Sequence, residues 1–111
     1  MIAVADLIPT DPDEQRTVRS VLDAHPELRG FIARASAKAE ALFPGATIRL
    51  DSVQYDEWDP PLQLTVLARL PLPEFSQRTD MLMSWVRSRP DNRPDLLAIF
   101  PQWAGEPRGT S

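Results

Sequence analysis

Apolar residues recur with a helical period in two long segments of this 111-residue chain. From Pro26 to Leu42 they return every three or four positions, which predicts a helix with one buried face. That face consists of Leu28, Phe31, Ile32, Ala35, Ala39 and Leu42. The same spacing predicts a second long helix from Pro73 to Ser88. Its inner residues are Phe75, Thr79, Leu82 and Val86.

A shorter helix is predicted ahead of these two. Asp11 can cap its first turn, and Pro12 suits the first helical position. Its apolar stripe consists of Val18, Val21 and Leu22. The helix is expected to end at the His25-Pro26 joint, because a residue before a proline is pushed away from the α conformation.

The period changes to two after the long first helix. Polar and apolar residues alternate from Ala46 to Val53 and again from Leu62 to Arg69, which predicts an antiparallel hairpin with one buried and one largely polar face. The apolar run Leu96–Phe100 shows no alternation, which predicts a last strand that is covered on both faces or paired centrally. Pro101 is expected to end that strand.

These elements follow the order α-α-β-β-α-β. We predict one α+β domain over residues 1–101, built in two layers from a three-stranded, mainly antiparallel sheet with the helices packed on one face. A right-handed crossover would make the last strand parallel to the second one. Residues 102–111 are expected to form a flexible C-terminal tail.

The chain carries little reactive chemistry, with no cysteine, four glycines and His25 as its one histidine. This inventory excludes thiol catalysis, disulfide bonds and metal clusters of cysteine or histidine. No serine has a histidine at a recognisable spacing, and His25 lies before a proline, where capping or packing is the commoner role. We therefore predict no catalytic, cofactor-binding or metal-binding residue, and expect that the protein is not an enzyme.

The charge pattern bears on partners and location. A formal net charge of −4 argues against a broad nucleic-acid-binding surface. Lys38 is the only lysine among the 12 basic residues, which indicates either the codon usage of a GC-rich genome or recognition of phosphate and carboxylate by arginine. Neither a membrane-spanning apolar stretch nor a secretion signal is visible, so we expect a cytoplasmic protein without membrane contact.

An acidic segment between the first two strands contains Asp56, Glu57, Trp58 and Asp59. Its carboxylates could hold a hard cation, but the segment lacks the glycine and the oxygen spacing of a calcium loop, and the alternative is a solvated turn. Trp58 could mark a protein contact or fold back over the sheet. We group these four residues with Trp85 and Trp103 as the predicted protein-binding surface.

Three arginines gather near the end of the later helix: Arg87, Arg89 and Arg93. They could bind an anion such as phosphate. Alternatively, they are helix-end charges that complement the helix dipole and are neutralised by Asp91 and Asp95. The second interpretation is the one we favour.

The segment from about His25 to Trp85 resembles a family of small bacterial α+β proteins with the order helix–hairpin–helix–strand. One long helix ends in Phe-Pro-Gly-Ala, and the later helix begins with Pro-Glu. The matching residues are Phe43, Pro44, Ala46, Pro73, Glu74, Leu82 and Trp85. The family has no established activity, so the resemblance implies a fold without implying a cofactor or a site residue.

Three functions follow as hypotheses. The preferred one is a small adaptor or regulatory protein that binds another protein or a second copy of itself, because a three-stranded sheet has open edges. The first alternative is a KH-like nucleic-acid-binding module, although the glycine loop of that fold is missing, with no glycine between Gly45 and Gly105. The second alternative is a metal-dependent enzyme that uses the acidic segment.

Overall fold

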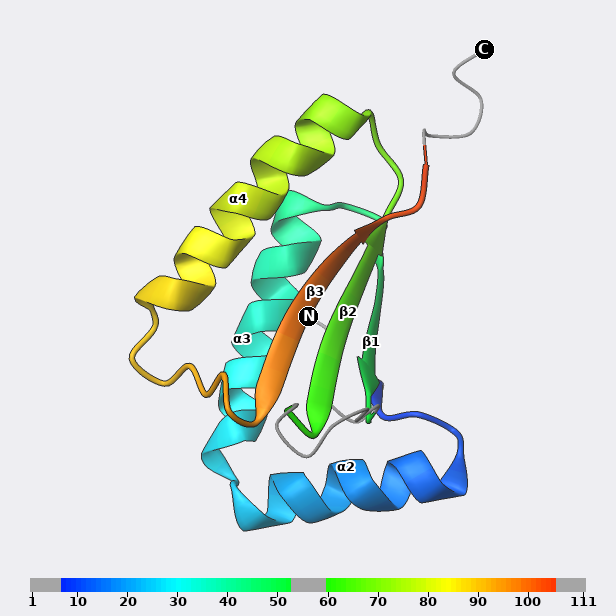
Figure 1. Ribbon diagram of the computed structural model, residues 1–111, viewed down its shortest axis with the longest axis vertical. Helices are drawn as coiled ribbons and strands as arrows, with labels where there is room; N and C mark the ends of the chain where they lie inside the picture. The colour runs from blue at the N-terminus through cyan, green and yellow to red at the C-terminus, as the bar shows by residue number, and fades with distance from the viewer. Residues whose placement is uncertain (1–6, 53–59, 106–111) are drawn as a thin grey trace.

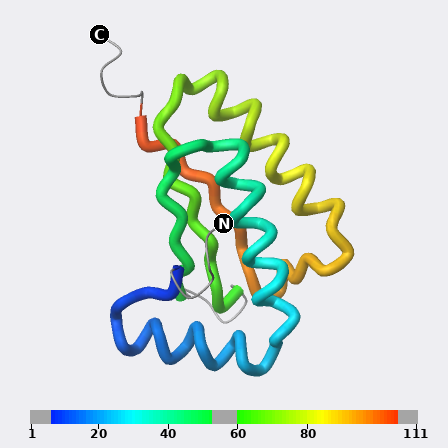
Figure 2. Tube along the Cα trace, turned by 180° about the vertical axis from the view of Figure 1, so that it is seen from behind, coloured from blue at the N-terminus to red at the C-terminus, as the bar shows by residue number. Residues whose placement is uncertain are grey.

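A three-stranded sheet lies against a layer of helices in the computed structural model, which describes residues 7–52 and 60–105 (Figure 1). The elements are α2 (Pro12–Ala24), α3 (Glu27–Leu42), β1 (Thr47–Asp51), β2 (Leu62–Ala68), α4 (Leu72–Ser88) and β3 (Leu97–Trp103). This is the predicted α-α-β-β-α-β order of an α+β fold. Helices α3 and α4 run alongside the sheet in opposite directions, and α2 lies across one end of the molecule (Figure 2). Within the described ranges, no helix is long and apolar enough to cross a bilayer.

Capping and glycine set the helix boundaries. The side chain of Asp11 accepts a hydrogen bond of 3.0 Å from the backbone N–H of Glu14, as predicted for the start of α2. That helix ends at His25, directly before Pro26. After α3, Gly45 adopts a φ of 80°, a conformation that costs little without a side chain, and this turn leads into β1.

The central strand of the sheet is β2. Strand β1 pairs with it antiparallel, with Arg49 opposite Thr65, and β3 pairs with it parallel, with Phe100 opposite Thr65. The sheet is therefore mixed, with one antiparallel and one parallel pair, where the sequence indicated mainly antiparallel pairing. The last strand pairs with the second one in parallel, as predicted.

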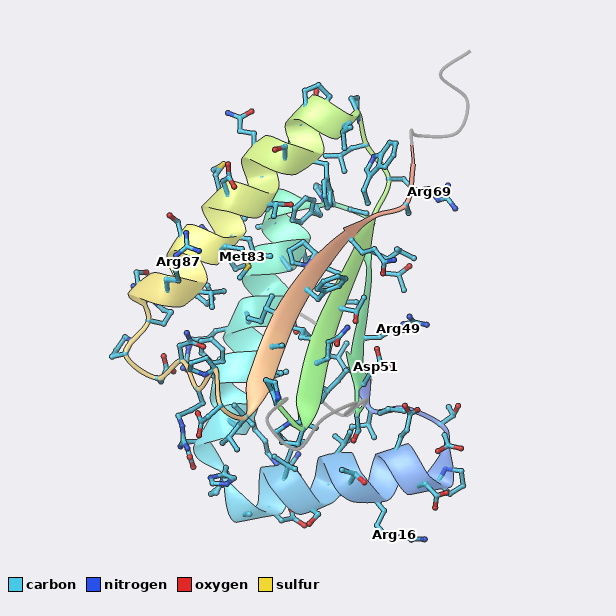
Figure 3. The ribbon with its side chains drawn as sticks, viewed as in Figure 1. Arg16, Arg49, Asp51, Arg69, Met83 and Arg87 are labelled. Atoms are coloured by element: carbon cyan, nitrogen blue, oxygen red, sulfur yellow. The ribbon has the colours of Figure 1, made fainter. Side chains whose placement is uncertain are left out.

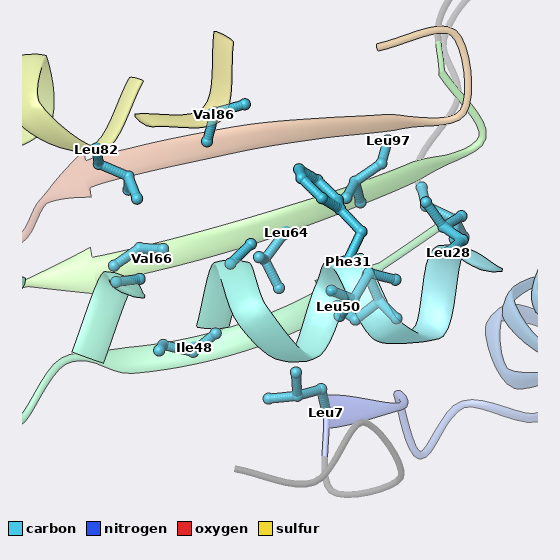
Figure 4. Packing of buried hydrophobic residues seen from close by; sticks show 14 of the residues in the cluster. Leu7, Leu28, Phe31, Ile48, Leu50, Leu64, Val66, Leu82, Val86 and Leu97 are labelled. Atoms are coloured by element: carbon cyan, nitrogen blue, oxygen red, sulfur yellow. The ribbon is translucent and has the colours of Figure 1, made fainter. Parts of the chain in front are cut away.

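The core fills the space between the helices and one face of the sheet (Figure 4). The strands contribute Ile48, Leu50, Leu62, Leu64, Val66, Ala68 and Leu97, all buried. Two aromatic pairs join α3 to α4: the ring centroids of Phe31 and Trp85 lie 6.2 Å apart, and those of Phe43 and Phe75 lie 5.7 Å apart. Such pairs add packing energy beyond the area that they bury.

Strand β3 differs from its prediction. It lies at the edge of the sheet instead of the centre, and the side chain of Phe100 is 51% exposed. It also continues through Pro101 to Trp103, two residues past the predicted boundary of the domain.

The hydrogen-bond ladder explains why Pro101 does not end β3. Leu62 donates its N–H to Leu96 O, and Ala104 donates its N–H to Ala68 O. In a parallel ladder with this phase, the backbone groups of residues 98, 100 and 102 bond to β2, while those of residues 99 and 101 point to the free edge. The missing N–H of proline therefore costs no bond within the sheet.

Candidate functional site

The sheet face opposite the core carries nine side chains, and we call it the open face. Because side chains alternate along a strand, the pairing assigns every second residue to this face. Its members are Thr47, Arg49, Asp51, Gln63, Thr65, Leu67, Ala98, Phe100 and Gln102. On the two flanking strands, Thr47, Arg49, Phe100 and Gln102 are exposed, so α2, α3 and α4 leave this face uncovered there.

An apolar spot lies on the β2–β3 side of the open face. Phe100 is 51% exposed, whereas Thr65, directly opposite it on the central strand, is only 4% exposed. Leu67 is half-buried on the same face, diagonal to Phe100. A half-exposed aromatic ring beside Thr65 and Leu67 can serve as an apolar contact for a partner.

A short polar network occupies the β1–β2 side. The amide of Gln63 donates to the Thr65 hydroxyl at 3.2 Å, and this hydroxyl donates to a carboxylate oxygen of Asp51 at 3.3 Å. Arg49 extends beside Asp51, away from the helices (Figure 3). These hydrogen bonds fix the orientation of Asp51, while the exposed side chain of Arg49 forms no ion pair with another described residue.

The two edges of the sheet are not equivalent. On β2, the backbone groups of residues 62, 64, 66 and 68 point to β3, so those of residues 63, 65 and 67 bond to β1. The backbone groups of Ile48 and Leu50 therefore point away from the sheet. Among the described residues, none makes a backbone hydrogen bond to them from that side. The β3 edge carries Pro101 in its middle, which disfavours the addition of a strand there.

A groove of about 330 Å³ follows the β1 edge. One wall consists of the consecutive residues Ile48, Arg49, Leu50 and Asp51. Because neighbouring side chains of a strand point to opposite faces, a groove that touches all four lies along the edge of the strand. The other wall is formed by residues 7–11 and Glu14. Its acidic residues, Asp11 and Glu14, make this wall negative.

The predicted protein-binding surface is not brought together by the residues that the structure describes. Asp56, Glu57, Trp58 and Asp59 lie outside them. Trp85 is half-buried near the end of α4, stacked on Phe31. Trp103 is 40% exposed, and its indole N–H donates to Leu70 O, at the other end of α4, at 2.9 Å. Trp85 and Trp103 thus serve two separate contacts.

The three arginines predicted as an anion site have different surroundings. Arg93 donates from Nε and Nη2 to both carboxylate oxygens of Asp95, at 3.1 and 2.9 Å. The guanidinium of Arg89 lies 5.5 Å from the ring centroid of Trp85, a cation–π contact. Arg87 is exposed and points away from the sheet (Figure 3).

The Arg93–Asp95 contact shifts both titrations. The hydrogen bond from Arg93 holds the pKa of Asp95 below its ordinary value of 3.8, and the same bond raises the pKa of Arg93. Arg93 also lies 3.6 Å from Glu27 at the start of α3. Asp91, which the sequence paired with these arginines, instead pairs with Arg34 of α3. The Arg93–Glu27 and Arg34–Asp91 ion pairs join α3 to the segment between α4 and β3.

His25 and the carboxylates do not form a reactive cluster in the described residues. The backbone of His25 joins α2 to α3, because it donates to Val21 O and accepts from Leu28 N–H, and its ring lies 3.7 Å from Glu27. No group of three or more histidine, aspartate and glutamate side chains in this part of the chain could hold a metal ion.

Sequence reasoning missed the open face as a site. The alternation around Arg49 and Asp51 already indicated in the sequence that their side chains lie on a polar face. The sequence did not indicate that Phe100 lies on the same face, because a run of five apolar residues does not specify which of them lies on the uncovered side.

No family model matches the chain, and comparison with curated proteins and with solved structures found no match. The resemblance of residues 25–85 to small bacterial α+β proteins thus stays a prediction.

Proposed function

We propose that this protein is a non-enzymatic adaptor or regulatory protein of the cytoplasm, and that it binds another protein through the open face of its sheet. The observation that carries the proposal is the half-exposed ring of Phe100 on a sheet face that α2, α3 and α4 leave uncovered at its flanking strands. An apolar anchor surrounded by hydrogen-bonding side chains is the usual composition of a non-obligate protein interface.

The balance of charge on the open face favours a protein over a nucleic acid. Arg49 and Asp51 are its only charged residues, so the face has no net charge. Nucleic acids are bound chiefly through phosphates, which require an excess of lysine and arginine.

Other exposed apolar side chains support the choice of this face. Leu72 and Met81 on α4 are 49% and 50% exposed. They are nine residues apart, which is about two and a half helical turns, so they lie on opposite sides of the helix. Single exposed apolar residues of this kind are ordinary on a protein surface.

Affinity capture with a matched pair of variants tests the proposal. Tagged wild type, Phe100→Ser and Met81→Ser are used to capture partners from extracts of the source cells. Both substitutions remove an apolar side chain that is half-exposed, and urea unfolding of the three proteins checks that the two variants are folded. We expect Phe100→Ser to lower the captured amount of a specific partner by about tenfold or more and Met81→Ser to leave it unchanged. Equal capture by all three proteins would contradict the proposal.

A further inference from the structure

We propose that two copies of this chain pair through their β1 edges and form one continuous six-stranded sheet. The inference goes beyond the proposed function, because it concerns the backbone edge of β1 and a second copy of the chain, although two residues of the open face, Arg49 and Asp51, take part in it. It starts from the backbone groups of Ile48 and Leu50, which point into the groove beside β1. No backbone group of the described residues bonds to them from that side, and a strand edge of this kind is a template for another strand.

The charges along the groove select the incoming strand. Three carboxylates line it, those of Asp11, Glu14 and Asp51, against the one guanidinium of Arg49. A strand that enters the groove is therefore stabilised by an arginine placed opposite Asp51. Strand β1 of a second copy carries such an arginine, Arg49. It is adjacent to Leu50, whose backbone groups point away from the sheet.

The spacing of these residues selects one register. In an antiparallel pair around a twofold axis at Leu50, the two Leu50 residues exchange both backbone hydrogen bonds, and Ile48 lies opposite Ser52 of the second copy. Arg49 then lies opposite Asp51 of the second copy, and Asp51 lies opposite its Arg49. Residues directly opposite at such positions are close, and opposite charges there are favourable.

Neighbouring registers lack this match. An axis at Arg49 places the two arginines opposite each other, and an axis at Asp51 places the two aspartates opposite each other, which is unfavourable in both cases. An axis at Ile48 places Arg49 opposite Thr47 and forms no ion pair. The Leu50 axis alone pairs both charges, and it also places the buried faces of both sheets on one side.

A swap of charges tests the register. In Arg49→Asp the new carboxylate faces Asp51 of a second identical copy, and in Asp51→Arg the new guanidinium faces Arg49. We expect each variant alone to dissociate about tenfold or more readily than the wild type. When the two variants are mixed in equal amounts, every pair across the axis again joins opposite charges. The mixture should therefore form a heterodimer about as stable as the wild-type dimer.

Sedimentation velocity distinguishes monomers from dimers. It is carried out over roughly a hundredfold range of protein concentration, because a homodimer forms by mass action. Arg87→Asp is the control, since it reverses an exposed charge on α4 and should leave dimerisation unchanged. A wild type that stays monomeric over the whole range would overturn the proposal. So would variants that dimerise like the wild type, or a mixture in which they do not associate.

Hydrogen exchange of the unmodified chain provides a second test that does not depend on the folding of any variant. The amide of Leu50 should exchange more slowly as the protein concentration rises, while the amide of Ile99 on the opposite edge should not change. An unchanged Leu50 amide, or one protected to the same degree at every concentration, would show that no second copy covers the edge. Neither test involves Phe100, so a failure of the dimer is distinct from a failure of partner capture.

Discussion

The guanidinium of Arg93 connects the segment between α4 and β3 with the start of α3. It donates twice to Asp95, just before β3, and lies near Glu27, the first residue of α3. Its neighbour in sequence, Arg89, covers the ring of Trp85 instead. The positive charges at Arg89 and Arg93 thus make contacts within the protein. Arg89 is exposed and Arg93 is only half-buried, so we expect these contacts to orient the segment before β3 more than to stabilise the protein.

Removal of Arg93 should be visible in the titration of Asp95. The hydrogen bond from Arg93 lowers the pKa of Asp95 below 3.8 in the folded protein. A carboxyl with a lowered pKa adds stability that is present above its unfolded pKa and is lost as the pH falls through its folded pKa. We expect Arg93→Gln to raise the pKa of Asp95 toward 3.8 and to weaken the loss of stability below about pH 4.

Carbon-detected NMR of the Asp95 carboxyl between neutral and acidic pH measures this pKa. Arg87→Gln removes a neighbouring positive charge that makes no contact with Asp95 in the described structure, and it should leave the titration unchanged. An Asp95 that titrates at its ordinary value in the wild type would contradict the account of this ion pair.

Local sequence rules determine some elements and fail for others. Helix α3 occupies Glu27–Leu42, as its apolar spacing and the flanking prolines predicted. The hairpin strands and α4 lie within one or two residues of their predictions for the same reason. Strand β3 was misplaced because Leu96–Phe100 lacks a period and because Pro101 stops a strand only where its N–H is needed. That depends on which neighbour the strand pairs with, a property of the whole sheet.

Gly45 offers a prediction about the joint between α3 and β1. Its φ of 80° favours glycine, and a Cβ built at this position would meet no atom within 4 Å. Any cost of a side chain there is therefore a cost of the backbone conformation. Gly45→Ala should lower the free energy of unfolding by about 1–2 kcal/mol.

Gly45→Asn is the matched control, because asparagine adopts positive φ more readily than alanine and should destabilise the protein less. Urea unfolding of the three proteins measures the difference. An alanine variant as stable as the wild type would show that the turn relaxes to another conformation.

For the molecule as a whole, the described helices pack against one side of the sheet and leave the flanking strands uncovered on the other side. Helices α3 and α4 bury one face, while the open face combines the apolar ring of Phe100 with the polar network around Thr65. These residues come from three strands and meet only through the pairing of β2 with β3. The sequence therefore predicted the polar side of the β1–β2 hairpin but not the apolar anchor beside it. Of the residues that it did propose for protein binding, Trp85 lies in α4, Trp103 ends β3, and residues 56–59 lie outside the described part of the chain.

We propose that the open face, and not α4, contacts a partner protein. Site-specific photocrosslinking in the source cells tests it most directly, with a photoreactive phenylalanine analogue placed either at Phe100 or at Met81. Both side chains are half-exposed, so the two probes are equally accessible. We expect a discrete crosslinked partner from position 100 and none from position 81. A partner captured from position 81 alone, or from neither position, would contradict it.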